Sequence, residues 1–390
     1  MQRILILTHE FPPFHGGIAA VAHGVAAGAA GLGYETHVLA PDFHSDTSEW
    51  DATQPYQISR FSGASCGTQN TDKLVRFAAH CRRCIAARRH DIIHAIDPPS
   101  QMALTGLSKL RLARTYFFTV YGTELLRYRN ELLARLWMQG AFSKASGIAA
   151  ISHYVHDLLL SNFKVSQDHV FVSHPGISPH WFETPITDSA GVRERWGVGS
   201  EDLVLITVAR RVPDKGHDRV IEGLARTPLP LRQRLVYVVV GTGPEDYAAA
   251  LASRARSESI RLHLLGTLSD RELLEAYDAA DVFIMLSRET PKRLEGLGLV
   301  YLEAGSRGVP SIAASTGGVP DAVRDGETGV LLTADPPAEQ VAQAIQTVAE
   351  EHELRSAMGR RAREFAATFT WTRHAREIYE RFSGALGKRL

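Results

Sequence analysis

The sequence predicts an α/β protein with two doubly wound parallel sheets, and three observations support this fold class. Short apolar segments recur without the alternation of half-exposed strands, so they predict strands buried on both faces. Amphipathic segments of helical length separate these strands. The chain has 390 residues, which is enough for two domains of ordinary size.

In the first half of the chain, the apolar segments predict six strands. They lie at 4–8, 36–40, 92–96, 116–120, 147–151 and 170–173. An alanine-rich segment at 18–31 is predicted to form the helix that crosses over after the first strand, and 73–89 has a helical pattern. This order of strands and helices predicts the first parallel sheet.

The second half repeats the same order. Its apolar segments predict strands at 203–209, 235–241, 260–265, 282–286, 310–314 and 329–332. Helical segments such as 246–257 and 270–279 lie between them. A second doubly wound sheet is therefore expected.

Glycine and proline residues gather at 176–199 and predict the linker between the two halves. We therefore expect Rossmann-like domains at 1–180 and 190–370. Residues 371–390 are expected to form a basic amphipathic helix, and composition does not indicate where it docks. Ligands of doubly wound sheets bind beyond the carboxyl ends of the strands, so we expect the site in a cleft between the domains.

The charge balance and the short apolar segments exclude several classes of protein. Forty-three basic and forty-three acidic residues give a formal net charge of zero, unlike that of a general nucleic-acid binder. The apolar segments are far shorter than the ~20 residues of a membrane-spanning helix. The first residues also lack the apolar region of a signal peptide. We therefore expect a cytoplasmic protein.

Three cysteines, Cys66, Cys81 and Cys84, do not form the dense framework of a secreted disulfide protein. A reducing compartment is therefore indicated. Cys81 and Cys84 are followed by His90 and His94, but the gap between the two pairs is shorter than a zinc finger needs. The better interpretation is that these cysteines serve as small apolar side chains of a helix.

Gly16 and Gly17 lie between the first predicted strand and its helix. Two glycines let a ligand approach the backbone there, and the start of the helix offers N–H groups to an anion. A tight turn that needs positive φ is an equally good interpretation of these two residues alone.

Arg210 and Lys215 follow a buried strand of the second half, at the edge where the cleft is expected. Two cations on one loop can neutralise a diphosphate as it becomes a leaving group, although basic surface loops are common. Further along the chain, Gly241-Thr-Gly243 resembles the start of a dinucleotide fingerprint but lacks its third glycine. It is weak evidence for NAD.

The stretch from Glu295 to Glu303 carries the strongest signal. Its glycine-rich loop is predicted to open a helix near Gly298, with the first carboxylate before the helix and the second in its second turn. Glu303 can accept hydrogen bonds from ribose hydroxyls, while Glu295 faces the group being transferred and the helix N-terminus takes phosphate. Apolar neighbours such as Leu297 and Leu299 argue against a solvated glutamate pair, because burying an unpaired carboxylate is unfavourable.

These motifs, together with the turn at Gly317 and Gly318, resemble the retaining glycosyltransferases of family 4, which have the GT-B fold. The resemblance covers nearly the whole chain. Ser287 and Arg288, with the stretch 295–304 that follows, are particularly similar to bacterial phosphatidylinositol mannosyltransferases. This similarity implies GDP-mannose as the donor.

The resemblance implies roles for individual residues. Arg210 and Lys215 would bind the donor diphosphate, and Gly17 would approach the phosphate. Glu303 would bind the ribose and Glu295 the donor sugar, so Glu295, Arg210 and Lys215 are the predicted catalytic residues. The donor site would also include Gly241, Leu297, Gly298 and Leu299, and the sugar or acceptor pocket Gly16, Tyr121, Ser152 and Tyr154. Tyr121 stands where the family often has histidine.

The implied reaction moves a hexose, with mannose as the leading choice, from a nucleoside-diphosphate sugar to a lipid-linked or saccharide acceptor. The acceptor would bind the N-terminal domain and the nucleotide sugar the C-terminal domain, in synthesis of cell-envelope glycan or exopolysaccharide. We expect neither a cofactor nor a metal. Three alternatives stay open: a UDP-sugar donor, a non-catalytic donor-binding subunit and an NAD-dependent oxidoreductase.

A membrane-borne acceptor would bring the protein to the inner face of the membrane. Basic residues of the first half could contact anionic lipid there, although solvated helix faces explain them equally well. These residues are Arg82, Arg83, Arg88, Arg89, Lys109, Arg111 and Arg114.

Overall fold

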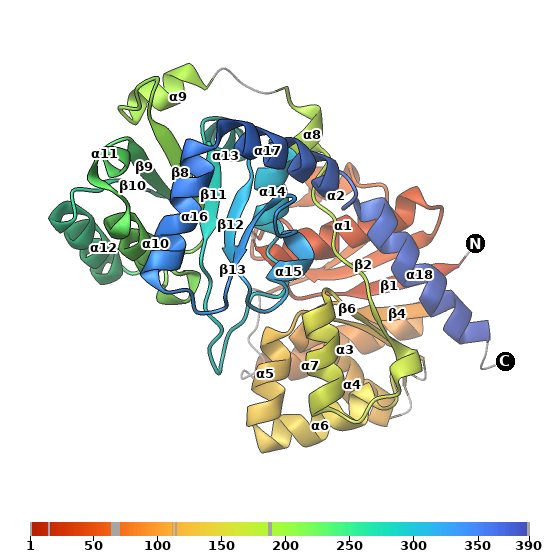
Figure 1. Cartoon of the computed structure of the whole chain (residues 1–390). Helices are drawn as coiled ribbons and strands as arrows, with labels where there is room; N and C mark the ends of the chain where they lie inside the picture. The colour runs from red at the N-terminus through yellow and green to blue at the C-terminus, as the bar shows by residue number, and fades with distance from the viewer. Residues whose placement is uncertain are drawn as a thin grey trace. The chain divides into compact units, whose positions relative to one another are not determined.

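The computed structural model describes residues 2–14, 16–63, 71–110, 112–113, 115–185 and 189–387. The chain forms two compact units (Figure 1). Unit 1 comprises Met1–Ser178 and Phe369–Leu390, and unit 2 comprises Pro179–Thr368. The C-terminal helix thus belongs to the first unit, although the second precedes it in sequence.

Unit 1 contains a seven-stranded parallel sheet in the order β3-β2-β1-β4-β5-β6-β7. Its strands are β1 (Arg3–Leu7), β2 (Glu35–Pro41), β3 (Gln57–Phe61), β4 (Ile92–Ala95), β5 (Phe117–Val120), β6 (Gly147–Ala150) and β7 (Val170–Val172). The order reverses between β1 and β4, as in a Rossmann sheet.

Unit 2 contains a six-stranded parallel sheet in the order β10-β9-β8-β11-β12-β13. Its strands are β8 (Leu203–Val208), β9 (Leu235–Val240), β10 (Arg261–Leu265), β11 (Val282–Met285), β12 (Ser311–Ala314) and β13 (Gly329–Leu332). The reversal lies between β8 and β11. Both sheets therefore have the doubly wound topology that the sequence predicts.

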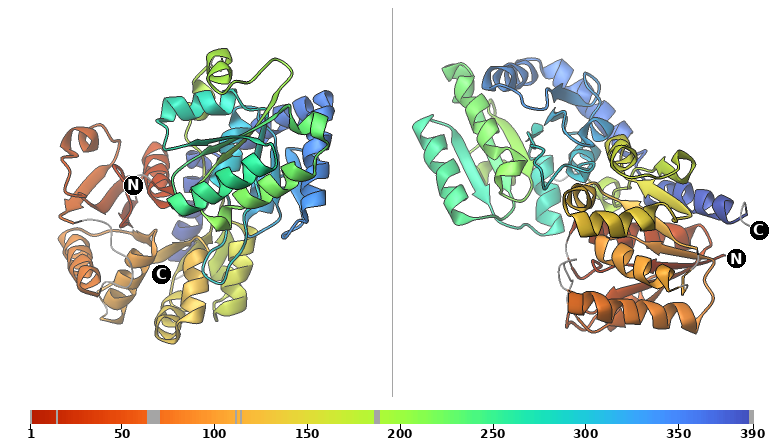
Figure 2. Two further views of the ribbon diagram at one scale, coloured as in Figure 1. Left: turned by 90° about the vertical axis from the view of Figure 1, so that its left-hand side faces the viewer. Right: turned by 90° about the horizontal axis from the view of Figure 1, so that it is seen from below.

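Helices cover both faces of each sheet (Figure 2). In unit 1 they are α1 (Gly17–Gly31), α2 (Ser48–Ala52), α3 (Thr71–Ala87), α4 (Pro98–Lys109), α5 (Thr123–Asn130), α6 (Leu132–Phe142), α7 (His153–Asn162) and α18 (Trp371–Gly387), with a 3-10 turn at Gln167–His169. In unit 2 they are α8 (His180–Glu183), α9 (Ala190–Arg195), α10 (His217–Arg226), α11 (Leu229–Arg232), α12 (Glu245–Ser257), α13 (Asp270–Asp278), α14 (Leu299–Ser306), α15 (Val319–Ala322), α16 (Ala338–Glu350) and α17 (His352–Ala366), with a 3-10 turn at Pro213–Lys215.

All twelve predicted strands are present. They could be predicted because strands such as β1, β9 and β11 are almost wholly buried and therefore form continuous apolar runs in the sequence. The prediction missed β3. This strand lies at the edge of its sheet, and its polar Gln57, Ser59 and Arg60 are only partly buried or exposed. An edge strand of this kind lacks the apolar run that marked the others.

The C-terminal helix α18 packs on α1, a contact that composition did not reveal. Two glycines of α1 provide the space: a Cβ atom on Gly24 would lie 2.1 Å from the Trp371 ring, and one on Gly28 would lie 2.5 Å from the Trp371 carbonyl oxygen. Further along α18, the Tyr379 hydroxyl lies 3.2 Å from His94 Nδ1, and Phe382 stacks on Phe117. The core of unit 1 is thus completed by residues far away in sequence.

This packing predicts that Gly24→Val destabilises the protein. The valine side chain would overlap the Trp371 indole, and overpacking of a filled interface typically lowers the free energy of unfolding by about 1–3 kcal/mol. Urea unfolding of the full chain measures the change. Gly31→Ala is the control, because no atom lies within 4 Å of a Cβ built at this last residue of α1. Equal stability of the two variants would contradict the proposed role of the glycine.

Candidate functional site

The reversal of strand order in unit 2 brings two loops together at the carboxyl edge of the sheet. β8 and β11 are neighbours, with Leu205 opposite Val282. The loop after β8 spans 209–216, and the loop after β11 spans 286–298. Ligands of doubly wound sheets bind at this reversal point. Most of the donor-site residues expected from the sequence lie on these two loops.

An ion pair connects the two loops. Lys215 Nζ lies 2.6 Å from Glu295 Oε2, and the two side chains are only 19% and 14% exposed. The Ser287 hydroxyl donates to the same carboxylate oxygen at 3.3 Å. The structure therefore brings two of the predicted catalytic residues into direct contact.

The backbone of Glu295 is fixed by the turn that follows β12. The Gly318 amide donates to the Glu295 carbonyl oxygen at 2.8 Å. Gly317 has φ of +53°, and a Cβ atom there would lie 2.2 Å from the same oxygen. Only glycine combines this left-handed conformation with so close an approach. The glycine turn quoted in the sequence analysis therefore holds the catalytic candidate in place.

Arg210 is the second predicted cation on the loop after β8. Its side chain is exposed, and within the part of the chain that the structure describes it forms no ion pair with a carboxylate. Lys215 is instead paired with Glu295. The two cations of this loop therefore differ, since one is already compensated by a carboxylate and the other is open to an anion.

A second ion pair, between the loop after β11 and the first turn of α10, was not predicted from the sequence. Arg288 donates to both carboxylate oxygens of Asp218, at 2.8 and 2.7 Å, and to the Pro213 carbonyl oxygen at 2.9 Å. Burial opposes ionisation of Asp218, but the hydrogen bonds and charge of Arg288 outweigh it and lower the pKa of Asp218. The pairing partners lie 70 residues apart, so no local pattern could reveal them.

Helix α14 begins at the same edge, directly after the loop of β11. Its N-cap, Gly298, has φ of +87°, and Leu297 before it is 2% exposed. The Tyr301 hydroxyl donates to the Met285 carbonyl oxygen at 2.9 Å, which anchors the first turn on β11. The helix start predicted near Gly298 is confirmed, and Leu299 is its first residue. A helix N-terminus at this edge favours an anion.

Glu303 is the fifth residue of α14. The Tyr277 hydroxyl donates to its carboxylate at 3.4 Å, and neither Lys215 nor Glu295 forms a hydrogen bond with it. Burial raises the pKa of Glu303 to about 7, and the Tyr277 hydrogen bond only partly offsets this effect. The two glutamates of the motif thus differ in surroundings, because one is ion-paired and the other is partly buried beside a tyrosine.

Gly241 follows β9, and its amide donates to the Gly266 carbonyl oxygen at 3.1 Å. The dinucleotide fingerprint instead follows the first strand of a Rossmann unit, which here is β8. Gly241 and Gly243 therefore lie one strand away from the position that NAD binding requires. This placement weakens the oxidoreductase alternative.

In unit 1, Gly16 and Gly17 form the start of α1, after β1. Gly16 is extended, with φ of −178°, and neither glycine has a positive φ. The interpretation as a turn that needs positive φ is therefore wrong. No atom lies within 4 Å of a Cβ built on Gly17, so the space beside it is open. A Cβ on Gly16 would lie 3.0 Å from the Phe14 ring.

Tyr121 follows β5 at the same edge of the unit 1 sheet. Its amide donates to Glu124 Oε1 at 2.5 Å. Its hydroxyl is buried and has no hydrogen-bond partner within the described residues. Burial raises the pKa of Glu124, and N–H donors, including that of Tyr121, partly oppose the effect. The predicted pocket residue therefore has an unsatisfied polar atom.

Ser152 is wholly buried, and its hydroxyl accepts from the Val155 amide at 3.3 Å. It is the N-cap of α7, and Tyr154 lies partly buried in the first turn of that helix. Ser152 thus has a clear structural role in capping.

A carboxylate that the sequence analysis did not single out organises this edge of unit 1. Asp97 accepts from the Thr8 hydroxyl at 3.0 Å, from the Glu10 amide at 3.2 Å and from the Ser100 amide at 2.9 Å. It therefore joins the loop after β1 to the start of α4. Burial and the charge of Asp97 raise the pKa of Glu10 to about 7. Asp97 precedes a proline pair at the start of a helix, which is a readable capping signal.

The residues considered for zinc do not converge. Cys81 is buried in α3, while His94 on β4 lies 2.8 Å from the Thr119 hydroxyl. Cys84 Sγ approaches His37 rather than His90. No metal-ligand group within the described ranges includes any of the four candidates. Cys66 lies outside the described residues.

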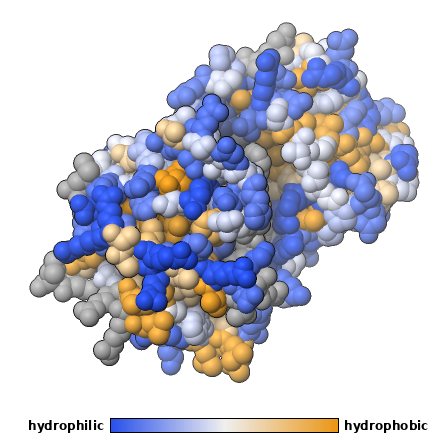
Figure 3. All heavy atoms as spheres, turned by 180° about the vertical axis from the view of Figure 1, so that it is seen from behind, coloured by the Kyte–Doolittle hydropathy of each residue, from blue (hydrophilic) through white to orange (hydrophobic). Residues whose placement is uncertain are grey.

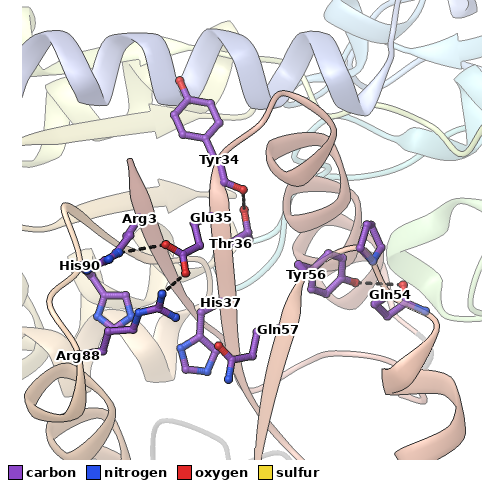
Figure 4. A pocket seen from close by; sticks show the side chains of 11 residues that line it. Arg3, Tyr34, Glu35, Thr36, His37, Gln54, Tyr56, Gln57, Arg88 and His90 are labelled. Carbon is purple, nitrogen blue, oxygen red and sulfur yellow. Dashed lines mark hydrogen bonds and ion pairs between the residues drawn. The ribbon is translucent and has the colours of Figure 1, made fainter. Parts of the chain in front are cut away.

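The basic residues considered for lipid contact also differ among themselves. Arg88 pairs with Glu35, which also accepts from Arg3 Nε at 3.0 Å. These residues line a pocket at the starts of β1, β2 and β3, opposite the carboxyl edge (Figure 4). Arg82, Arg83 and Arg89 are exposed, whereas Arg111 and Arg114 lie outside the described residues. No helix in the described part of the chain has the length and apolar character to cross a bilayer.

Two family models match the chain, one in each half. Residues 15–181 match Glycosyltransferase Family 4, and residues 189–365 match Glycosyl transferases group 1. The chain is 28% identical to a GDP-mannose-dependent alpha-(1-6)-phosphatidylinositol monomannoside mannosyltransferase of Mycolicibacterium smegmatis, with 98% of each chain covered. It is 32% identical to a D-inositol 3-phosphate glycosyltransferase of Streptomyces scabiei, over 58% of this chain and 51% of that protein.

Solved structures share the fold. Anabaena Alr3699/HepE in complex with UDP and glucose has a TM-score of 0.79 and 20% identity, with 98% of this chain and 100% of that chain covered. Sucrose-phosphate synthase of Thermosynechococcus elongatus has a TM-score of 0.81 and 18% identity, with both chains fully covered. The two Rossmann-like units are thus those of the GT-B fold.

The raised pKa of Glu303 predicts a pH dependence of stability. The folded-state pKa of about 7 exceeds that of an unfolded glutamate, so the stabilisation linked to this proton is complete below about pH 4.5 and is lost as the pH rises to 7. Relative to Glu303→Gln, the wild type should lose on the order of 3 kcal/mol of unfolding free energy between pH 4.5 and pH 8.

Urea unfolding of both proteins across this pH range measures the difference. Glu364→Gln, at an exposed position of α17, is the matched control and should follow the wild type. A constant difference between wild type and Glu303→Gln would show that the Glu303 carboxyl ionises normally.

Proposed function

Because the chain belongs to glycosyltransferase family 4, we propose that it transfers mannose from GDP-mannose, with retention of configuration, to a lipid-linked or saccharide acceptor. The chain is a hexosyltransferase that uses a nucleotide sugar. One observation carries the finer proposal: Lys215, Glu295 and the start of α14 meet at the strand-order reversal of unit 2. The family places such charges against a nucleotide sugar.

The names of the relatives support the choice of donor. The full-length relative from Mycolicibacterium smegmatis is named as GDP-mannose-dependent and acts on a phosphatidylinositol monomannoside. A UDP-sugar is the alternative donor, since the Anabaena structure contains UDP and glucose. The low identity to that protein supports the fold alone, so GDP-mannose is our first assignment.

We assign the loops of unit 2 to the nucleotide. Arg210 and Lys215 would neutralise the diphosphate, assisted by the N-terminus of α14. Glu303 would accept hydrogen bonds from the ribose hydroxyls, and Glu295 would contact the donor sugar. The Lys215–Glu295 pair supports this division, because it holds side by side a cation that suits phosphate and a carboxylate that suits sugar hydroxyls.

The proposed step is a front-side attack. The acceptor oxygen forms a bond to the anomeric carbon as the bond from that carbon to the diphosphate oxygen breaks, on the same face of the sugar. The acceptor proton passes to the leaving phosphate oxygen. The residues of the chain contribute orientation and stabilisation of the leaving charge, and no enzyme nucleophile is required.

We assign the carboxyl edge of unit 1 to the sugar and the acceptor. Gly17 has open space beside its backbone, and the Tyr121 hydroxyl is buried without a partner. A sugar hydroxyl would satisfy this tyrosine, because a buried unpaired hydroxyl is unfavourable. The proposed location is cytoplasmic, at the inner face of the membrane, in synthesis of cell-envelope glycan or exopolysaccharide.

Donor screening tests the proposed function. In a thermal-shift series, GDP and GDP-mannose should raise the unfolding midpoint, UDP and ADP less so, and NAD not at all, because a ligand stabilises only the folded state that binds it. Release of GDP from GDP-mannose should then depend on an added acceptor extract. If only UDP-sugars stabilised the protein, the donor would be a UDP-sugar instead of GDP-mannose. Nucleotide-sugar binding without release of the nucleoside diphosphate would indicate a non-catalytic subunit.

A second prediction concerns the leaving group. If Arg210 and Lys215 stabilise the departing diphosphate, transfer should proceed in EDTA, and Arg210→Ala or Lys215→Ala should lower turnover about 100- to 1,000-fold. Arg210→Lys should also be impaired if the contact is bidentate. Arg256→Ala, at an exposed position of α12, is the matched control.

Initial rates of the four variants with and without EDTA measure these effects. Inhibition by EDTA that magnesium or manganese reverses would show that a metal ion stabilises the charge of the leaving diphosphate. Near-normal rates in both alanine variants would exclude the two cations from the step.

A further inference from the structure

Large apolar side chains are exposed mainly on one part of unit 1. Among the described residues, nine such side chains are exposed, and six of them lie within 110–137. They are Leu110, Leu112, Leu132, Leu133, Leu136 and Trp137. This concentration is unusual, since scattered exposed apolar residues need no explanation but a contiguous set marks an interaction surface.

Helix α6 carries the centre of this surface. Leu132, Leu133 and Leu136 are 71%, 83% and 64% exposed, and the spacing of 132/136 and 133/137 places two pairs on one outward face. The inward face is already filled, because Met138 and Phe142 are wholly buried. The helix is therefore apolar on both sides. We call Leu110, Leu132, Leu133, Leu136 and Trp137 the α6 patch.

Cations accompany the α6 patch. Lys109, at the end of α4, places its Nζ 3.4 Å from the centre of the Trp137 ring, which also shows that α4 and α6 are neighbours (Figure 1). Arg135 is exposed on α6 itself and Lys144 just after the end of this helix, whereas the exposed Glu131 is paired with Arg127. The segment 109–144 contains seven basic and two acidic residues in a chain of zero net charge.

We infer that the α6 patch docks on an anionic lipid surface. Leucines that project outward can enter the acyl region, a tryptophan prefers the interface, and lysine or arginine heads remain at the level of the lipid phosphates. In Figure 3, which views the molecule from behind Figure 1, hydrophobic (orange) groups lie among hydrophilic (blue) ones at the lower edge, the level at which α6 lies in Figure 1.

A second copy of the chain is the less favourable occupant. In a two-fold dimer the same patch would face itself, so the cations around it would meet like charges in a desolvated interface. Anionic lipid instead complements both the charge and the apolar side chains. This inference concerns a surface of unit 1, whereas the residues assigned to the nucleotide diphosphate belong to unit 2, and it does not depend on the identity of the donor.

Flotation of the full-length protein with lipid vesicles tests the inference. Vesicles of phosphatidylcholine with 30% phosphatidylglycerol, a composition chosen for its charge, should bind the protein more tightly than pure phosphatidylcholine vesicles. Binding should weaken in 1 M salt, where the screening length is only about 3 Å. Arg135→Ser should weaken binding about fivefold, the effect of one cation near an anionic surface.

The double variant Leu133→Ser/Leu136→Ser should weaken binding about tenfold or more, because two apolar side chains no longer enter the lipid. Leu229→Ser is the matched control, since Leu229 is a 52% exposed leucine of α11 in unit 2. Circular dichroism and the unfolding midpoint establish that all variants fold. Trp137→Phe should remove a blue shift of tryptophan emission that vesicles cause in the wild type.

No binding to anionic vesicles, or equal binding by wild type and the leucine double variant, would overturn the inference. So would a wild-type dimer in sedimentation experiments that the double variant abolishes, because the patch would then be a contact between copies. These outcomes test the membrane location and are separate from the proposed transfer reaction, since vesicle binding is measured without donor or transfer.

Discussion

The reversal of strand order between β8 and β11 is the constraint on which the carboxyl edge of unit 2 depends. It makes two loops neighbours although their residues lie about 80 positions apart. The Lys215–Glu295 ion pair joins the two loops, and the Asp218–Arg288 pair joins the loop after β11 to the first turn of α10. Both pairs are partly buried, so water solvates their charges only in part. Removing one partner would therefore leave the remaining charge without a counter-charge in a partly desolvated place. If these groups act on a donor as proposed, they would need little reorganisation when charge develops.

A buried ion pair also fixes the C-terminal end of α14. Arg307, which follows the last residue of the helix, forms a wholly buried ion pair with Asp278, with its Nε 2.7 Å from the carboxylate. Its remaining donors bind carbonyl oxygens of the linker at Trp181, Thr184 and Pro185. The helix is therefore anchored at both ends, on β11 through Tyr301 and on the linker through Arg307. An anion at the start of α14 would meet a helix whose orientation is fixed.

The fold was readable from sequence because strands buried on both faces leave continuous apolar runs, whereas the edge strand β3 leaves none. Glu295, Lys215 and Gly298 were also readable, since glycine spacing and charge lie within short motifs. Asp218–Arg288, Asp97 with Thr8, and the packing of Trp371 on Gly24 were not, because each contact joins segments far apart in the chain. Sequence patterns report periodicity and local capping, while such contacts depend on topology that only the folded chain supplies.

Among the carboxyl groups at the carboxyl edges of the two sheets, two have pKa values raised to about 7. Burial is the main cause for both Glu303 and Glu10, and the pKa of each is about 7. Near neutral pH each group is therefore partly protonated and partly ionised. A ligand can change the proportion of the two forms at a small cost in free energy. A hydroxyl that donates to Glu303 favours the ionised form, so nucleotide binding would release a proton from unit 2. Glu10 lies beside the Asp97 charge, so an incoming cation or hydroxyl donor would favour its ionisation in the same way. If both edges bind sugar hydroxyls as proposed, each would release part of a proton on binding, because burial keeps Glu303 and Glu10 partly protonated near neutral pH.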